Sequence, residues 1–286
     1  MPALFESADA TSIRGQRRHL QAIRVQLLLL AAAAALGAIS FRLSPDDVDW
    51  AAFAAGTAFV AAALVRVHHF ATQPDGDWFD GRALAESVKT LAWRYAVGGA
   101  PFAVSLDAIE ADREFVARTS SLLDELSLTT VLVVGEGKEE ITDWMRELRG
   151  CLLEQRREAY DKGRLQDQLA WYSLKANANR KSAGRLNALT LSIEGAGAVG
   201  AFLTATGTVT IDLLGFAGAV VAALTAWGQA KQHSMLASSY SIAAHELSAI
   251  RALSGAPVAE DAWASFVGEA EEAISREHTL WRASVR

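Results

Sequence analysis

Cysteine is nearly absent from this chain, and four long stretches of it contain almost no charge. Cys151 is the one cysteine among 286 residues, which excludes an intramolecular disulfide and suits a reducing compartment. Of the 27 basic and 33 acidic residues, all except Glu194 lie outside four apolar windows, at residues 25–41, 50–65, 187–205 and 213–230. About 17 to 25 apolar residues span a bilayer core, so each window predicts a transmembrane helix.

Enzyme signatures are also missing. The segment Gly135-Glu-Gly137-Lys138 lacks the spacing of a phosphate-binding loop, and the adjacent His68 and His69 form no metal-binding set. No serine lies in a nucleophile elbow. We therefore expect no enzymatic activity, no cofactor and no metal. A net charge of −6 gives no broad basic surface, so nucleic acid is not an expected partner.

The four windows pair into two hairpins, because only residues 42–49 separate the first two and residues 206–212 the last two. Basic residues gather on one side of these hairpins, which by the positive-inside rule places both termini and residues 70–185 in the cytoplasm. The sequence predicts an all-α, multi-pass membrane protein with two transmembrane hairpins and long cytoplasmic helices forming a bundle. The basic residues that carry this orientation are Arg14, Arg17, Arg18, Arg24, Lys175, Arg180, Lys181, Arg185 and Lys231.

Helical patterns continue outside the spans. They predict helices over residues 78–95 and 106–126, a nearly unbroken helix from Lys138 into the third span, and an extension of the fourth span to Leu253. The apolar run 130–134 is expected to be an ordered loop. We expect a first hairpin module at 1–102, a connecting helix and loop at 103–137, and a second hairpin module at 138–286.

A last helix carries apolar anchors at alternating spacings of four and three, typical of packing on another helix. Its acidic residues, Glu271 among them, are expected on a solvated face. The anchors and the residues that continue their seam are Trp263, Val267, Ala270, Ile274, Glu277 and Trp281.

Glu194 is the one charge among the 26 residues between Arg185 and Asp212, roughly 14 Å into the third span at 1.5 Å per residue. An ionisable residue at such depth indicates a functional face. The residues sharing its helical stripe are small or polar, which predicts a pore lining. This predicted lining consists of Asn187, Thr190, Glu194, Gly197, Ala201 and Thr204.

A second polar stripe precedes the third span, and a similar set with the same steps occurs in the first half at Arg82, Glu86, Lys89 and Trp93. The stripe is interpreted either as a cytoplasmic vestibule that handles ions or a charged ligand, or as hydrogen-bonded contact between helices or subunits. It consists of Arg164, Gln168, Trp171, Lys175 and Asn179.

The pattern that several of these residues form resembles that of a known family. The second half of the chain, about residues 138–286, resembles the SLATT domains, which are two-transmembrane modules. The resemblance implies an association with nucleotide-signalling proteins of bacterial conflict systems and a proposed role as pore-forming effectors. Residues 82–102 suggest a second, divergent copy around the first hairpin. The matching residues are Tyr160, Arg164, Gln168, Trp171-Tyr172, Lys175-Ala176, Asn179, Trp263, Phe266-Val267, Ala270-Glu271, Glu277 and Trp281.

The sequence leaves two functions open. The first is a homo-oligomeric channel or pore in the lipid bilayer, lined by the second hairpin and responding to a nucleotide-signalling or sensor protein. In the first hairpin a stripe of small residues favours close helix packing. The alternative is a membrane-anchored interaction module without conduction, in which Glu194 is buried. The stripe of small residues in the first hairpin consists of Ala51, Ala55, Ala58 and Ala62.

The predicted topology is testable by cysteine labelling with an impermeant reagent in intact cells. Ser44→Cys and Asp212→Cys, in the two turns, should react from outside. Ser254→Cys should not react, because the basic residues retain its segment in the cytoplasm. Labelling of Ser254→Cys in intact cells would overturn this topology.

Overall fold

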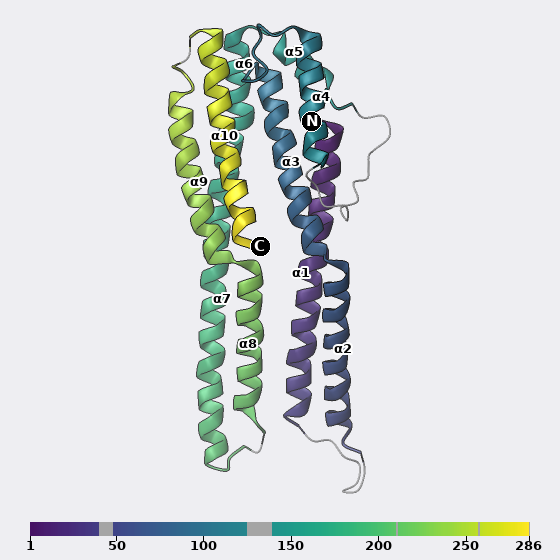
Figure 1. Cartoon of the computed structure of the whole chain (residues 1–286). Helices are drawn as coiled ribbons and strands as arrows, with labels where there is room; N and C mark the ends of the chain where they lie inside the picture. The colour runs from purple at the N-terminus through teal and green to yellow at the C-terminus, as the bar shows by residue number, and fades with distance from the viewer. Residues whose placement is uncertain (40–47, 125–138, 210, 257, 286) are drawn as a thin grey trace. The chain divides into compact units, whose positions relative to one another are not determined.

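A computed structural model describes residues 1–39, 48–124, 139–209, 211–256 and 258–285, with the side chains beyond residue 275 excepted (Figure 1). Throughout these ranges the regular structure is helical. The helices are α1 Ala3–Gly37, α2 Trp50–Thr72, α3 Pro74–Val97, α4 Ala108–Asp124, α5 Asp143–Arg149, α6 Leu153–Tyr160, the π-helix η1 Asp161–Gln166, α7 Asp167–Ala205, α8 Leu213–Lys231, α9 His233–Leu253 and α10 Glu260–Val285.

Four helical paths are long and apolar enough to cross a membrane: Ala3–Gly37, Trp50–Thr72, Leu153–Ala205 and Leu213–Leu253. They coincide with the four predicted windows and confirm an all-α membrane protein with two hairpins. The helices predicted at 106–126 and after Pro257 are also confirmed, as α4 and α10. The helix predicted from Trp78 begins earlier, at Pro74, because proline is favoured in the first helical turn. The expected loop at 130–134 and the seam residues Glu277 and Trp281 lie outside the described backbone or side chains.

The unbroken helix predicted from Lys138 is wrong between Arg149 and Leu153. Leu152 is extended there, with φ −60° and ψ 152°, and α6 begins after it. The break is held by Arg156, whose Nε donates to the Cys151 carbonyl at 3.1 Å. The helix predicted to continue from the fourth span to Leu253 is confirmed except at Gln232. That residue has a left-handed backbone, with φ 49°, and its N–H donates to the Gly228 carbonyl, so α8 ends there.

The chain divides into two compact units. The first, called here the bundle unit, contains residues 1–16, 75–175 and 239–286, and the second, the membrane unit, contains residues 17–74 and 176–238. α1 and α7 each continue from one unit into the other as a single helix.

Aromatic side chains fill the centre of the bundle unit. Trp263 and Tyr160 are fully buried, and their rings meet edge to face at 5.7 Å. The Trp93 ring lies 6.0 Å from that of Tyr160, and the indole N–H of Trp263 donates to the Val97 carbonyl at 2.8 Å. The contact joins α10 to the end of α3, so helices distant in sequence share one core.

Glycine allows α7 and α8 to approach closely in the second hairpin. A Cβ atom added at Gly197 would lie 2.7 Å from Ala217 Cβ, and one added at Gly200 would lie 2.7 Å from Leu213 Cβ. Larger residues at either position would push the helices apart. In the first hairpin the predicted alanine stripe lies on the inner side of α2, since Ala51 and Ala62 are buried while Phe59 and Leu64 are exposed.

Candidate functional site

A fully buried ion pair lies at the centre of the bundle unit. Arg164 donates from Nε to Glu271 Oε1 at 2.8 Å and from Nη2 to Oε2 at 2.7 Å. The two residues are only 1% and 0% exposed. This side-on, two-bond geometry is the strongest form of a carboxylate–guanidinium contact. Each charge depends on the other, because an isolated charge in this environment would be costly.

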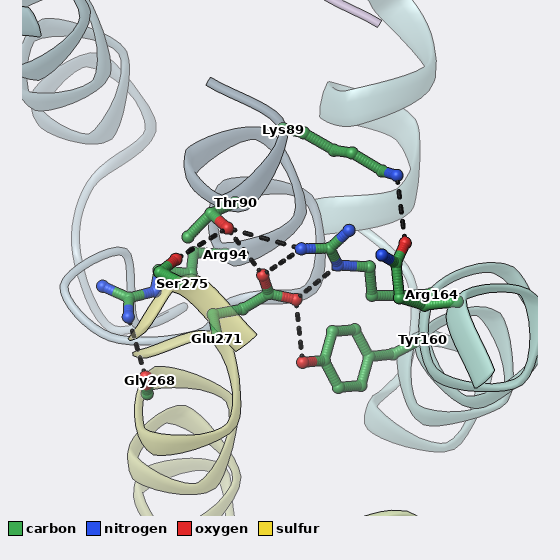
Figure 2. Close-up of polar contacts among 9 residues, drawn as sticks. Lys89, Thr90, Arg94, Tyr160, Arg164, Gly268, Glu271 and Ser275 are labelled. Atoms are coloured by element: carbon green, nitrogen blue, oxygen red, sulfur yellow. Dashed lines mark hydrogen bonds and ion pairs between the residues drawn. The ribbon is translucent and has the colours of Figure 1, made fainter. Parts of the chain in front are cut away.

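Two hydroxyl groups complete the coordination of the Glu271 carboxylate. Tyr160 donates to Oε1 at 2.9 Å, and Thr90 donates to Oε2 at 2.9 Å, with Ser275 Oγ 3.3 Å from the Thr90 oxygen (Figure 2). Burial and the negative charge of Glu271 raise the pKa of Tyr160 well above its usual value. The tyrosine therefore stays protonated and keeps its donor role at any physiological pH.

Four helical segments supply this cluster. Thr90 comes from α3, Tyr160 ends α6, Arg164 lies within η1, and Glu271 belongs to α10. A second contact binds α10 to α3, from Arg94 Nη2 to the Gly268 carbonyl at 2.8 Å (Figure 2). The cluster therefore fixes the position of η1, and with it the beginning of α7, against α3 and α10.

The structure brings the two predicted polar sets together across α3 and α7. Lys89 Nζ donates to Gln168 Oε1 at 3.3 Å, and the Arg82 guanidinium lies 5.6 Å from the centre of the Trp171 ring. Lys175 Nζ lies 5.6 Å from the same ring. Burial lowers the pKa of Lys89.

Members of the predicted vestibule differ in their surroundings. Arg164 and Gln168 are 1% and 4% exposed, which favours the interpretation as contact between helices for these two residues. Both side chains bind residues of other helices. The vestibule interpretation stays a prediction for Trp171 and Lys175, which reach the surface. Asn179 lies in the membrane unit, where its Oδ1 is 2.7 Å from His233 Nδ1.

The solvated face predicted for the acidic residues of the last helix is wrong for Glu271. Its carboxylate is the centre of the cluster. A signal was present in the sequence, because Glu271 lies four residues after Val267 and next to Ala270, on the apolar side of the helix. The prediction of a solvated face rested on the acidic composition of the segment and did not use this position. Thr90 and Ser275, which also join the cluster, carried no distinguishing pattern.

The predicted pore stripe is divided by the packing of α8. Gly197 is buried against Ala217, whereas Asn187 and Glu194 are exposed. Thr190 and Ala201 are half-buried, and Thr204 is exposed. Within the described residues the Glu194 carboxylate has no hydrogen-bond or ion-pair partner.

Comparison with protein families gives two matches along the chain. Residues 2–157 match the SMODS and SLOG-associating 2TM effector domain 3, and residues 160–281 match the SMODS and SLOG-associating 2TM effector domain 1. The chain belongs to the SLATT superfamily. It contains two SLATT domains, which confirms the predicted second copy around the first hairpin. No curated protein and no solved structure matches the chain.

The buried cluster joins the two SLATT domains. Thr90 and Arg94 belong to the first domain, whereas Arg164, Gly268 and Glu271 belong to the second. The two domain matches meet between residues 157 and 160, directly before η1, whereas the sequence-derived boundary was placed at 137/138. The bundle unit is thus a shared product of both domains.

Arg164→Met should destabilise the bundle unit by about 3–5 kcal/mol, because it leaves the Glu271 carboxylate buried without its counter-charge. The measurement is denaturant unfolding of the purified chain in detergent, followed by circular dichroism. Adding Glu271→Leu should recover part of the loss, since it removes the stranded charge.

Glu158→Gln serves as the control for this pair. Glu158 forms an exposed ion pair with Lys162 at 2.5 Å, and its loss should leave the unfolding midpoint unchanged. Equal midpoints for Arg164→Met and the parent chain would contradict a stabilising role for the buried cluster.

Proposed function

We propose that this protein is a homo-oligomeric, pore-forming SLATT effector that passes ions across the bacterial inner membrane. The second hairpin lines the pore, and Glu194 contributes one carboxylate per chain to a ring. Acidic rings of this kind favour cations. The predicted lining residues Asn187 and Thr204 continue the path on either side of Glu194.

The surroundings of Glu194 are the observation that carries this proposal. The side chain lies deep in an apolar span, is exposed in the single chain, and has no partner within the described residues. Facing hydrocarbon would cost a carboxylate on the order of 3 kcal/mol. Water in a pore, or a polar contact supplied by another copy, removes that cost.

Assembly follows from the same constraint. One chain with four spans is too thin to enclose an ion path with Glu194 facing water, so several copies are needed. Identical subunits commonly close into rotationally symmetric rings. Because each chain carries two SLATT domains, each subunit contributes two hairpins to the ring.

The trigger is proposed from the family description. SLATT domains are described as associating with SMODS and SLOG domains, which supports a nucleotide-signalling or sensor protein as partner. The basic residues flanking the spans support a cytoplasmic location for both termini and for the bundle unit, where such a partner would bind.

The alternative function is a membrane-anchored interaction module. In that case Glu194 binds a helix of another protein, and the hairpins only hold the bundle unit at the membrane. The shared core of the two SLATT domains supports this alternative, because a folded bundle unit can bind a partner without a pore. Ion flux separates the two functions.

Charge removal at Glu194 tests the pore directly. Glu194→Gln keeps the shape of the side chain and should lower cation preference, measured as the reversal potential in planar bilayers. Glu194→Leu replaces the polar ring with an apolar one and should abolish flux from liposomes. Native mass spectrometry should show the same assembly for both variants.

Ser192→Ala is the matched control, because Ser192 is an exposed polar residue of the same span about 200° around the helix from Glu194. Its hydroxyl donates within the helix, to the Ala188 carbonyl at 2.9 Å, so flux should be unchanged. Unchanged reversal potentials in both Glu194 variants would assign Glu194 a structural role. Absence of flux from the parent chain would favour the anchored module.

A further inference from the structure

We propose that η1 is a switch between π and α winding, and that Glu271 of α10 controls it by determining which residue of α7 faces the pore. The consequence for conduction rests on the proposed pore function. The change of winding itself does not rest on that function, and cross-linking measures it without measuring ions.

η1 is a six-residue π-helix inserted in an otherwise α-helical path from Leu153 to Ala205. π-Helices are rare, are usually limited to one turn, and occur frequently at functional sites. This one lies between the bundle unit's α6 and α7, the helix that carries Glu194. No proline interrupts the path, so either winding is available to its backbone.

Contacts from three other helices hold η1 in the π form. Arg251 of α9 binds Asp161, the first residue of η1, through two bonds of 2.8 and 3.1 Å. At Gly163 an added Cβ atom would lie 2.8 Å from Cη2 of Trp93 on α3, so only glycine fits there. Glu271 of α10 binds Arg164.

The Glu271 carboxylate also fixes the winding angle. Its Oε1 atom accepts from both Tyr160, the residue before η1, and Arg164 within it, at 2.9 and 2.8 Å. The two donors must therefore keep one angular relationship around the helix axis. Changing the winding between them moves one donor away from the shared oxygen.

The change in winding has a defined geometric result. A π turn closes with i→i+5 bonds and so contains one residue more than an α turn. If η1 converts to α winding, α7 turns by about 100° relative to α6. Each residue of α7 then takes the angular position of its successor. Ile193 takes the place of Glu194, and Ala196 takes the place of Gly197.

This rotation would replace a ring of carboxylates by a ring of isoleucines. It would also loosen the second hairpin, because Ala196 and Val199 would face α8 where Gly197 and Gly200 now allow close approach. The contacts of η1 and the glycine contacts with α8 hold the present orientation of α7.

Disulfide cross-linking reports the orientation of α7 in membranes. In a Cys151→Ser background, the pair Gly197→Cys and Ala217→Cys reports the present orientation, and Ala196→Cys with Ala217→Cys reports the rotated one. Cysteine Cβ atoms bond at about 3.5 to 4.5 Å. The Cβ atoms of the 197/217 pair would start 2.7 Å apart, so the two helices must separate by about 1 Å for this bond to form. In the parent chain the 197/217 pair should cross-link several-fold more than the 196/217 pair.

Two variants should reverse that ratio. Gly163→Ala places a Cβ atom against Trp93 and so disfavours the π form, and Glu271→Gln weakens the bond that fixes the winding. Deleting Lys162, an exposed residue of η1, should act as the control. The deletion removes the additional residue of the π turn, so η1 winds as α without turning α7. In a chain that combines this deletion with Glu271→Gln, the 197/217 pair should still cross-link more than the 196/217 pair.

A parent-like ratio in Glu271→Gln and Gly163→Ala would overturn the switch. Reversal in the chain that combines the Lys162 deletion with Glu271→Gln would also overturn it, because the rotation would then not come from the winding of η1. If Gly163→Ala does not accumulate, Glu271→Gln alone decides. Reversed cross-links in the variants, together with no ion flux from the parent chain, would support the switch while refuting the pore.

Discussion

The Arg164–Glu271 ion pair is the interaction on which the rest of the bundle unit depends. Two opposite charges with almost no solvent exposure are costly in a protein core unless they are held together. Tyr160 and Thr90 donate to the remaining positions of the carboxylate, whereas Arg164 Nη1 has no hydrogen-bond partner among the described residues. Meeting these requirements brings α3, α6, η1 and α10 to one point, and so unites the two SLATT domains in a common core.

The second constraint is the apolar environment of the spans. It permits close helix packing where glycine occurs, at Gly197 and Gly200, and it penalises Glu194 unless water or another copy is present. The ion pair and the glutamate are connected through α7, which runs from Asp167 to Ala205 without interruption. The proposed switch uses this continuity of the backbone.

The spans were predictable from sequence because hydropathy, length and the exclusion of charge are local properties of a segment. The SLATT resemblance was also readable, since its residues recur at fixed helical steps. The break before Leu153 was missed although α5 ends at a glycine, Gly150, whose N–H donates to the Arg146 and Glu147 carbonyls. The bond from Arg156 to the Cys151 carbonyl, which follows the break, could not be read from the sequence. The π winding of η1 depends similarly on contacts from α3, α9 and α10. Glu271 was misjudged because acidic neighbours suggested solvent, whereas its position beside Ala270 and Val267 turns it toward the core.

The central claim, that Glu194 faces water in an assembly of identical chains, is tested most directly by an experimental structure of the protein in lipid nanodiscs. Our account predicts a closed ring of several chains with the Glu194 carboxylates directed toward a common water-filled axis. A structure in which Glu194 points into lipid, or is enclosed against a helix away from any axis, would contradict it.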